Sequence, residues 1–530
     1  MIKIKKKLFL KTKSLRFLIP PVFMAVFPIL SFYLTNISEL SLKFIEKPLF
    51  YSIISAITVT LLLFVLAKSK NKASLIASLF LLIFFSYGHL SNSLNDKLFI
   101  QLPNSIVLGP DKVLLPLIFG LFIILSAKIL KSENKLTGTA AFLKVSLLVL
   151  VACLSMVIIK TEYQKKDNAL VRPIKTEDEG LIVRENAPDI YYLILDGYAR
   201  QDILQKVYDY DNSEFIDNLE KMGFYVADSS RSNYLHTYLS LPSTLNMRYL
   251  DELPEKYGPN PASGLAAREL TAENEVSQKL KNYGYTIINF ASTWEGTDEK
   301  YQADITYKED EYFKIMGKNI ALDETSITFL QTTLLSPLIK EVWGDALRAR
   351  TLATLQKLPT IPFQEGKKFT LAHIMAPHPP YVFTAEGNPV PNAELEMADE
   401  GIDKRQKYLD QLVFISGQII PVLQKIIQNS PRPPIIILQS DHGPGSIFGE
   451  PENWLENYSP EGMSERSGIL SAVYFPDQNY KDFYSAITPV NTFRILFNNY
   501  FGENLELLPD KTFYTSYEAI YDFKDVTDIK

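Results

Sequence analysis

The sequence predicts a two-part protein, with a bundle of five transmembrane helices followed by an α/β domain whose largely parallel sheet lies between helices. Three observations predict this fold class. Five long apolar stretches occur before residue 160, and the charges between them alternate along the chain. From residue 189 onward, short runs rich in β-branched and aromatic residues alternate with helical patterns. A chain of 530 residues is long enough for two such domains.

Each of the five apolar stretches approaches the roughly 17–25 residues that a helix needs to cross a bilayer. A cleavable signal peptide would not be followed by four further segments of this kind. We therefore expect a transmembrane domain over residues 1–160, and the alternative is a set of buried helices in a soluble protein. The stretches are Phe17–Leu34, Leu49–Ala67, Ala73–Leu90, Val113–Ile129 and Ala141–Ile159.

The lysines and arginines between these stretches predict how the chain crosses the membrane. The N-terminus and the second and fourth connections are basic, whereas the first and third carry Glu39, Glu46, Asp96 and Asp111. Cytoplasmic connections are enriched in Lys and Arg, so the N-terminus is expected in the cytoplasm. Five spans of the cytoplasmic membrane then place the remainder of this multi-pass chain outside the cytoplasm.

The charge balance differs between the two parts of the chain and excludes some classes of partner. Residues 1–160 hold 19 Lys and Arg against 5 Asp and Glu, and the remainder holds 35 against 55. An acidic domain is a poor ligand for phosphate backbones, which argues against nucleic acid as a partner. The single cysteine, Cys153, lies in an apolar run, which excludes a disulfide framework and a Cys-rich zinc site.

Residues 161–188 are polar and without clear periodicity, which predicts a linker. The α/β domain is expected over residues 189–530, and active sites on such sheets lie at the carboxyl ends of the strands. The expected strands are Ile190–Leu195, Phe224–Ala227, Thr286–Phe290, Phe369–His373, Ile435–Leu438 and Ile469–Phe475. Helical patterns between them include Ser213–Lys221, Asn274–Asn282 and Lys404–Gln428.

Two of the predicted strands lead into acidic residues. Ile190–Leu195 runs directly into Asp196, and Ile435–Leu438 runs through Gln439 and Ser440 into Asp441-His442-Gly443. Both carboxylates would lie at one edge of a parallel sheet, where oxygen and imidazole ligands suit a divalent cation such as Zn²⁺ or Mn²⁺. The alternative is that each aspartate caps a helix or stabilises a turn.

A third strand leads into two histidines, His373 and His378. Pro379 and Pro380 end regular structure, so His378 is expected on a stiff loop beyond the strand. A group in that place can meet a substrate phosphate or sulfate. The alternatives are a capping or core role for His378, and for His373 a side chain that points into the sheet.

A nucleophile is expected in the segment from Arg231 to Asn246, where a helix begins after a strand. A hydroxyl at a helix N-terminus meets a positive dipole and free N–H groups, which favour an anionic substrate. Coordination to a metal lowers the pKa of such a hydroxyl and makes it a nucleophile. The alternative is an ordinary N-cap.

These segments resemble the alkaline phosphatase superfamily, and within it the membrane-anchored, sulfatase-like branch that includes lipoteichoic acid synthases and lipid A phosphoethanolamine transferases. Four motifs match in order along the chain. They are the strand-end acid at Asp196, the Thr-x-x-Ser-x-Pro segment from Thr237 through Ser240 to Pro242, the His-x-x-x-x-His-x-Pro segment from His373 to Pro380, and Asp441-His442-Gly443.

The resemblance implies an alkaline-phosphatase-like α/β domain that holds one divalent metal ion, Zn²⁺ or Mn²⁺. By the same resemblance, Thr237 would attack phosphorus or sulfur, and His378 would bind the substrate oxyanion together with His373. Trp294 resembles an aromatic residue that lines the pocket of lipoteichoic acid synthases, although a Trp after a strand can equally be packing. The implied metal ligands are Asp196, Thr237, Asp441 and His442.

The chain also departs from its relatives. No histidine follows His442, whereas two-metal relatives carry one later in the chain. Glu465 and Arg466 lie in that region instead, which favours a single-metal site with a cationic substrate contact from Arg466. The disulfides of the phosphoethanolamine transferases are absent as well.

The function expected from these features is phosphoryl-group transfer or hydrolysis through a covalent threonine intermediate. The spans would keep the site near a membrane lipid headgroup or an envelope glycan ester. One alternative is a sulfatase with a formylglycine at Ser240, although Thr244 stands where that motif has Arg. Another is a non-catalytic membrane protein whose outer domain binds a ligand.

Overall fold

The computed structural model describes most of the chain, and it divides the chain into two compact units. The first unit is Met1–Ala169 with Thr325–Ile339, and the second is Leu170–Glu324 with Lys340–Lys530. Residues 168–186, most of the predicted linker, lie outside the described residues. The described residues are 15–37, 40, 42–94, 100–102, 106–108, 110–167, 187–259, 264–292, 294–298, 302–308, 314–315, 318–319, 324–390, 402–448, 459–516 and 519–528.

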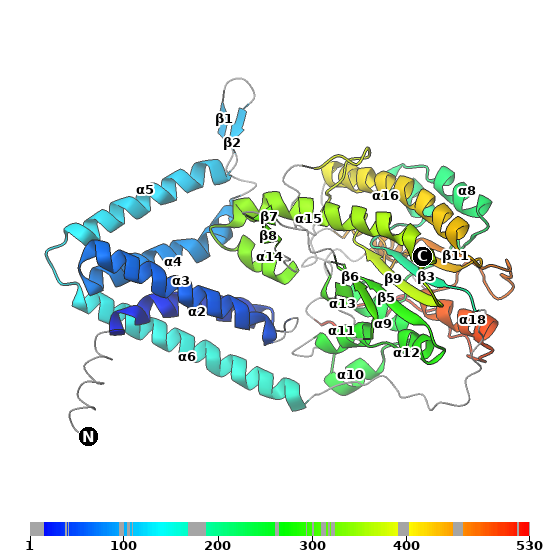
Figure 1. The fold of residues 1–530 in the computed structure, drawn as a ribbon, viewed down its shortest axis with the longest axis horizontal. Coiled ribbons are helices and arrows are strands. Elements are labelled where there is room, and N and C mark those ends of the chain that lie inside the picture. The colour runs from blue at the N-terminus through cyan, green and yellow to red at the C-terminus, as the bar shows by residue number, and fades with distance from the viewer. Residues whose placement is uncertain are drawn as a thin grey trace. The chain divides into compact units, whose positions relative to one another are not determined.

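The first unit contains the five predicted apolar helices, and by length and composition each of them could cross a membrane. A short helix, η1 (Arg16–Leu18), precedes them, and a two-stranded hairpin of β1 (Ile100–Leu102) and β2 (Ile106–Leu108) joins the third to the fourth. The long helices are α2 (Ile19–Thr35), α3 (Lys43–Ala67), α4 (Lys70–Ser93), α5 (Pro110–Lys131) and α6 (Thr137–Asp167) (Figure 1).

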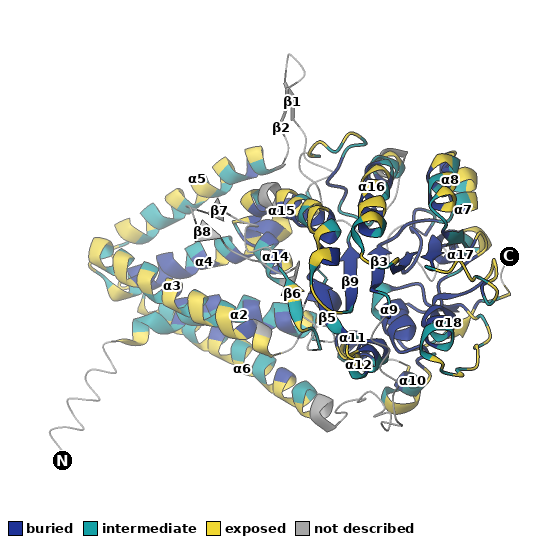
Figure 2. Ribbon diagram, turned by 45° about the vertical axis from the view of Figure 1, so that its right-hand side comes forward, coloured by how far each residue is buried: buried dark blue, intermediate teal, exposed yellow. Residues whose placement is uncertain are grey.

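The surface of the first unit is apolar. Only 11%, 6% and 11% of the most apolar windows of α3, α5 and α6 are buried, and large apolar side chains on these helices are exposed (Figure 2). Water would make so much exposed apolar surface unfavourable, whereas lipid is as apolar as the side chains. The exposed side chains include those of Leu62, Val65, Phe119, Phe142 and Ile159.

Helix α14 (Glu324–Gln331) and the residues after it bring a distant part of the sequence into the first unit. Phe329 packs between Phe32 of α2 and Phe85 of α4, with ring centroids 5.3 Å and 6.2 Å apart. The Gly88 N–H donates to the Thr332 carbonyl at 3.1 Å, and the Leu334 N–H donates to the Phe84 carbonyl at 2.7 Å. In an ideal α-helix the Gly88 N–H would donate to the Phe84 carbonyl. Here both groups bond to Thr332 and Leu334, so this segment takes part in the backbone hydrogen bonding of α4.

The second unit is built on a seven-stranded sheet in the order β4-β11-β10-β3-β9-β5-β6. The five strands from β10 to β6 are parallel. At one side, β11 pairs antiparallel with β10, and β4 pairs antiparallel with β11. All six strands predicted from the sequence are present. The strands are β3 (Ile190–Leu195), β4 (Tyr225–Val226), β5 (Thr286–Phe290), β6 (Ile305–Tyr307), β9 (Lys368–Ile374), β10 (Ile435–Gln439) and β11 (Ser471–Tyr474).

Alternate residues of the central strand β3 face two separate cores, as the two-residue period of a strand requires. Tyr191, Leu193 and Leu195 pack with α7 (Gln201–Tyr208), α8 (Ser213–Lys221) and α16 (Ile402–Asn429). Ile190, Tyr192 and Ile194 pack with α9 (Thr237–Leu245), α12 (Glu275–Asn282) and α18 (Pro489–Phe501). The sheet therefore lies between two helical layers (Figure 1), and its central strands β3 and β9 are buried along their whole length (Figure 2).

Shorter elements complete the described part of the chain. The helices are α10 (Glu252–Tyr257), α11 (Leu265–Ala272), α13 (Glu295–Asp298), α15 (Ser336–Lys357), η2 (Leu358–Phe363) and α17 (Pro460–Ser467). Two further two-stranded sheets pair β7 (Lys314–Ile315) with β8 (Lys318–Asn319), and β12 (Phe513–Tyr514) with β13 (Lys524–Asp525).

Candidate active site

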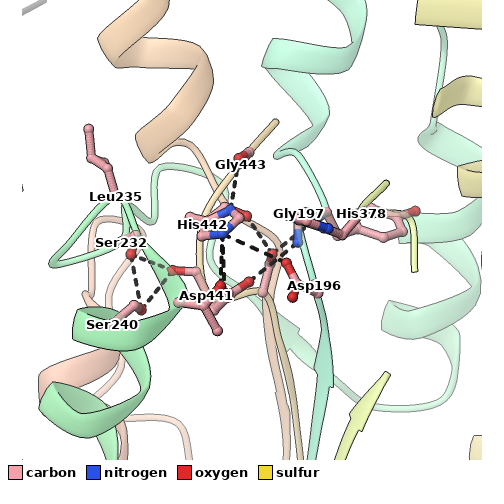
Figure 3. Close-up of polar contacts among 12 residues, drawn as sticks. Asp196, Gly197, Ser232, Leu235, Ser240, His378, Asp441, His442 and Gly443 are labelled. Carbon is pink, nitrogen blue, oxygen red and sulfur yellow. Dashed lines mark hydrogen bonds and ion pairs between the residues drawn. The ribbon is translucent and has the colours of Figure 1, made fainter. Parts of the chain in front are cut away.

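The predicted site residues come together at the carboxyl edge of the parallel strands. In the register of the sheet, Ile194 of β3 pairs with His373 of β9 on one side and with Gln439 of β10 on the other. Asp196 follows β3 by one residue and Asp441 follows β10 by two, so both aspartates lie beyond the same edge. Asp196, Asp441 and His442 are each only 1% exposed. Figure 3 shows that the three side chains lie together.

Each of the two buried carboxylates has one oxygen with a partner and one without. Asp196 Oδ2 lies 3.0 Å from His373 Nε2, and Asp441 Oδ1 accepts from the Gly197 N–H at 3.3 Å. Within the described part of the chain, Asp196 Oδ1 and Asp441 Oδ2 have no hydrogen-bond partner. Buried anionic oxygens without partners are strongly unfavourable, and a bound cation would remove that cost.

His442 completes a convergent set of donor atoms. Its Nδ1 lies 3.0 Å from the Gly443 carbonyl, which selects the tautomer with the proton on Nδ1 and leaves Nε2 as an acceptor. Nε2 is 3.1 Å from Thr237 Oγ1, 3.4 Å from Asp441 Oδ2 and 3.7 Å from Asp196 Oδ1. Ligands around a tetrahedral Zn²⁺ lie about 3.3 Å apart, so this set fits a divalent ion.

The electrostatics of the site follow from burial and from the pairing of like charges. Burial by itself would raise the pKa of Asp196, but His378 and the hydrogen bond with His373 hold it well below its usual range. Burial, and then the charge of Asp196, raise the pKa of Asp441 to about 6. Burial, reinforced by Arg466, lowers the pKa of His442 well below its ordinary value, so the ring is neutral and able to bind a metal.

Thr237 and Ser240 carry the two candidate reactive hydroxyls, and the structure places them in different surroundings. Thr237 is the first residue of α9, is half-buried, and directs Oγ1 toward His442. Ser240 is 1% exposed, and its hydroxyl donates to the Asp441 backbone carbonyl at 2.7 Å. Ser232 donates to the same carbonyl (Figure 3). Ser240 therefore supports the loop that carries Asp441, whereas Thr237 faces the cluster.

His373 lies inside the protein, in the sheet, which is one of the two alternatives that the sequence left open for it. Its side chain is fully buried, with Nε2 on Asp196 Oδ2 and Nδ1 2.9 Å from Thr297 Oγ1. Thr297 Oγ1 in turn lies 2.7 Å from the Ser292 hydroxyl. Both ring nitrogens are thus engaged by the protein, and the ring orients Asp196 so that its other oxygen points into the site.

His378 lies on the loop beyond β9 and is half-buried. Its Nδ1 is 2.6 Å from the Pro379 carbonyl, and its backbone N–H donates to the Asp196 carbonyl at 2.9 Å. Asp196, His378 and His442 each offer one ligand atom, and these three atoms lie within 4.8 Å of one another. His378 therefore has a ring nitrogen available beside the cluster.

Arg466 is buried and held by three contacts around the cluster. It donates to the Leu235 carbonyl and to the Gly443 carbonyl, each at 2.9 Å, and its third nitrogen is 3.1 Å from His442 Nε2. The guanidinium thus brings a fixed positive charge to the edge of the cluster. The sequence predicts Arg466 near the site because it lies in the region where two-metal relatives carry a later histidine.

Trp294 lies beside His373, with ring centroids 5.9 Å apart and an edge-to-face geometry. The ring also packs closely over Gly296, where an added Cβ would lie 1.9 Å from it. The ring therefore packs beside His373, which contacts Asp196, and against one of the two apolar cores that flank β3. Arg350 of α15 binds the Ser292 carbonyl and Asp298 in the same region.

Three residues support the site in ways that the sequence did not predict, although Glu465 is named above for its place beside Arg466. Gly197 has φ +72°, a left-handed conformation that lets its N–H reach Asp441. Thr297 holds His373. Glu465, which is 0% exposed, accepts from Tyr208, from the Ser446 hydroxyl and from two backbone N–H groups of the loop after Gly443. The Asp-Gly pair after a strand could have indicated Gly197. The roles of Thr297 and Glu465 depend on contacts between residues far apart in the chain.

Comparison with known proteins bears on this arrangement. A family model described as Sulfatase matches residues 188–496. No curated protein sequence matches the chain.

Several solved structures are similar at low sequence identity. The C-terminal periplasmic domain of EcEptC from Escherichia coli, in complex with Zn, is 11% identical, with a TM-score of 0.40 over 61% of this chain and 84% of that one. The integral membrane lipooligosaccharide phosphoethanolamine transferase A from Neisseria meningitidis is 10% identical, with a TM-score of 0.40 over 91% and 95%. The sulfatase yidJ from Bacteroides fragilis, described as putative, is 14% identical, with a TM-score of 0.40 over 64% and 84%.

Proposed function

We propose that this chain, which belongs to the sulfatase family and is an enzyme of the alkaline phosphatase superfamily, transfers or hydrolyses a phosphoryl group through a covalent bond to Thr237. The observation that carries the proposal is the convergence of Thr237 Oγ1 with His442 Nε2 and two unpartnered carboxylate oxygens. The family relation alone admits phosphate and sulfate esters. The geometry of Thr237 favours the threonine route.

Four residues would hold the metal: Asp196, Thr237, Asp441 and His442. One divalent ion, Zn²⁺ or Mn²⁺, would lower the pKa of the Thr237 hydroxyl and offset negative charge on the substrate. His373 would keep Asp196 in the orientation that leaves Oδ1 free for the ion. The neutral His442, with its proton on Nδ1, would offer the lone pair of Nε2.

The chemistry would proceed by two displacements at the transferred group. In the first, Thr237 Oγ1 bonds to phosphorus as the bond to the leaving oxygen of the donor breaks. In the second, the hydroxyl of an acceptor, or water, displaces Thr237 and regenerates the enzyme. Arg466 would donate hydrogen bonds to the oxygens of the transferred group, where negative charge builds up, and His378 in its imidazolium form would donate another from Nε2.

The spans suggest where the substrate is found. We propose that the N-terminus is cytoplasmic and that residues 189–530 lie outside the cytoplasmic membrane, because the basic connections alternate with acidic ones. An enzyme held at that surface would meet a lipid headgroup or an envelope glycan ester. We also propose residues 1–160 as the transmembrane domain and 161–188 as the linker.

The nucleophile is tested by trapping the intermediate. Full-length protein is mixed with a phospholipid bearing a fluorescent headgroup, quenched in acid, and digested for peptide mass spectrometry. A phosphoryl-linked headgroup fragment is expected on Thr237. Thr237→Ala should lose turnover by about 10⁴-fold or more, as nucleophile removal does elsewhere. The matched change Ser240→Ala should cost less than about tenfold, because that hydroxyl supports the backbone.

A sulfatase is the second candidate, favoured by the family match and by Ser240-Leu-Pro242-Ser243. That route requires a formylglycine at position 240, where the side chain is buried and bonded to the Asp441 carbonyl. Mass spectrometry of the peptide over residues 231–247 separates the two. An aldehyde at Ser240, with an active Thr237→Ala variant, would replace the threonine proposal with the sulfatase.

A further inference from the structure

A cavity of about 380 Å³ lies in the first unit, between α2 and α4, and Thr332 lies at its edge. This volume falls within the range of about 300–1,000 Å³ that small-molecule sites occupy. The second unit contributes no residue to it, because residues 325–339 belong to the first unit. The cavity is therefore separate from the cluster around Asp196 and Asp441.

The lining of this cavity changes from apolar to polar along both helices. On α2, Met24 and Phe27 are followed by Ser31, Phe32 and Thr35, and Asn36 is the C-cap of the helix. On α4, Leu82 is followed by Ser86 and His89. Because α3 returns the chain between them, α2 and α4 run in the same direction, and their polar ends lie on the same side of a membrane.

The length of the lining matches one leaflet of a bilayer. From Met24 to Asn36, an α-helix rises about 18 Å at 1.5 Å per residue. The hydrocarbon core of a bilayer is about 30 Å thick, so one leaflet contributes about 15 Å. The apolar end of the cavity is thus at acyl-chain depth, and the polar end is at the level of ester and headgroup oxygens.

The polar end offers hydrogen-bonding groups without charge. Ser86 and His89 are exposed, and neither side chain has a hydrogen-bond partner within the described part of the chain. None of the lining residues is Asp, Glu, Lys or Arg. A hydroxyl and an imidazole suit ester and phosphate oxygens, and a histidine facing lipid is costly unless it meets such groups.

From this we propose that the cavity is a binding site for one glycerophospholipid. An acyl chain lies against Met24, Phe27 and Leu82, and the glycerol ester and phosphate oxygens meet Ser86 and His89. The occupant is a lipid because exposed apolar side chains surround these helices, and lipid is the medium that suits them. In the orientation proposed above, the lipid belongs to the outer leaflet.

The bound lipid would also contact the segment that enters from the second half of the sequence. Thr332 lines the cavity and accepts the hydrogen bond from Gly88, one residue before His89. A lipid in the cavity therefore packs against Thr332 and stabilises the place of this segment on α4. We expect loss of the lipid to loosen this segment before it affects the sheet.

Native mass spectrometry of full-length protein tests the site. The protein is purified in detergent, exchanged through delipidating detergent, and titrated with phosphatidylglycerol of defined acyl chains. Wild type should retain one phospholipid per chain. Ser86→Phe fills the cavity and should lower that occupancy at least tenfold. Ser55→Phe, the same change at an exposed position of α3, should leave it unchanged.

Two further variants keep the result interpretable. Ser31→Leu narrows the cavity from α2, so it should lose the lipid even if Ser86→Phe fails to fold, as judged by gel filtration and melting temperature. Thr237→Ala should bind lipid like wild type, so failure of the proposed chemistry would not imitate failure of the site. Wild type without phospholipid, or folded Ser86→Phe or Ser31→Leu with full occupancy, would overturn the proposal.

Discussion

The two units of this chain place their polar and apolar groups in opposite ways. In the second unit, apolar side chains fill cores on both faces of the sheet, and a cluster of buried polar groups lies at one sheet edge around Asp196 and Asp441. In the first unit, large apolar side chains face outward. Polar contacts there join helices from within, as when Tyr33 donates to Glu162 and Tyr87 donates to Asp111.

This difference shows that the surrounding medium decides where a polar group is stable. In lipid, a hydroxyl or a carboxylate is stable only beside another polar group, so helix pairs are joined at such contacts. In water, burying a carboxylate is costly, so the two unpartnered carboxylate oxygens in the second unit form a group that could hold a cation. This comparison can be tested in both units by substitutions that remove or add one chemical group.

The largest effect is expected at Asp441. Asp441→Asn removes a metal ligand, so headgroup release from a fluorescent phospholipid should fall at least about 1,000-fold. In metal-free protein the same change should raise stability by about 2 kcal/mol, because it removes one of two buried like charges. Thermal melts with and without chelator measure the second effect. A variant that is less stable than wild type in chelator would show that the carboxylates do not repel.

A smaller effect is expected at His373, which supports Asp196 without facing the substrate. His373→Asn should lower metal affinity and turnover by about 10–100-fold, as changes to residues behind metal ligands do. Because the metal is held more weakly, added Zn²⁺ or Mn²⁺ should restore part of the activity. Trp294→Phe keeps an aromatic ring beside His373 and serves as the matched control. Loss of substrate affinity with unchanged metal affinity would instead place His373 against the substrate.

In the first unit, Gly88 and Gly120 form a matched pair of helical glycines. A Cβ at Gly88 would lie 1.9 Å from the Gln331 carbonyl oxygen, whereas nothing lies within 4 Å of one at Gly120. Gly88→Ala should therefore cost about 2 kcal/mol by displacing residues 331–334. Gly120→Ala should be neutral or stabilising by up to about 1 kcal/mol, since Ala favours helices. Melting curves and protease sensitivity near residue 332 report both. If Gly88→Ala and Gly120→Ala changed stability equally, the placement of residues 331–334 would not depend on Gly88.

The pH dependence of metal binding gives the smallest expected effect. The pKa of Asp441 is raised to about 6 in the metal-free protein, so the carboxyl is protonated below that pH and ionised above it. A metal must displace this proton at low pH, so affinity should fall by about tenfold per pH unit below pH 6 and be level above it. His442 adds no proton in this range, because its pKa is lowered. Calorimetric titrations from pH 5 to 8 measure the slope, and a flat profile would exclude Asp441 as a ligand.

The positions of the strand-end residues could be predicted because they depend on local pattern. Ile190–Leu195 and Ile435–Gln439 are short apolar runs, and parallel pairing brings the residues after both strands to one edge of the sheet. The sequence therefore predicts that Asp196, Asp441 and His442 lie together at this edge. Which oxygen of each aspartate is unpartnered could not be predicted, since that depends on His373 and on Gly197.

The sequence alone determined that five helices are long and apolar enough to cross a membrane, and that an α/β domain with acids at two strand ends comes after them. Length, composition and two-residue periodicity are local properties, so no tertiary information was needed. Only the tertiary structure decided that Ser240 supports the Asp441 backbone, that His373 serves Asp196, and that residues 325–339 belong with the helices of the first unit. These depend on contacts between residues that are up to about 250 positions apart, as between Gly88 and Thr332, and such contacts leave no periodic trace in the sequence.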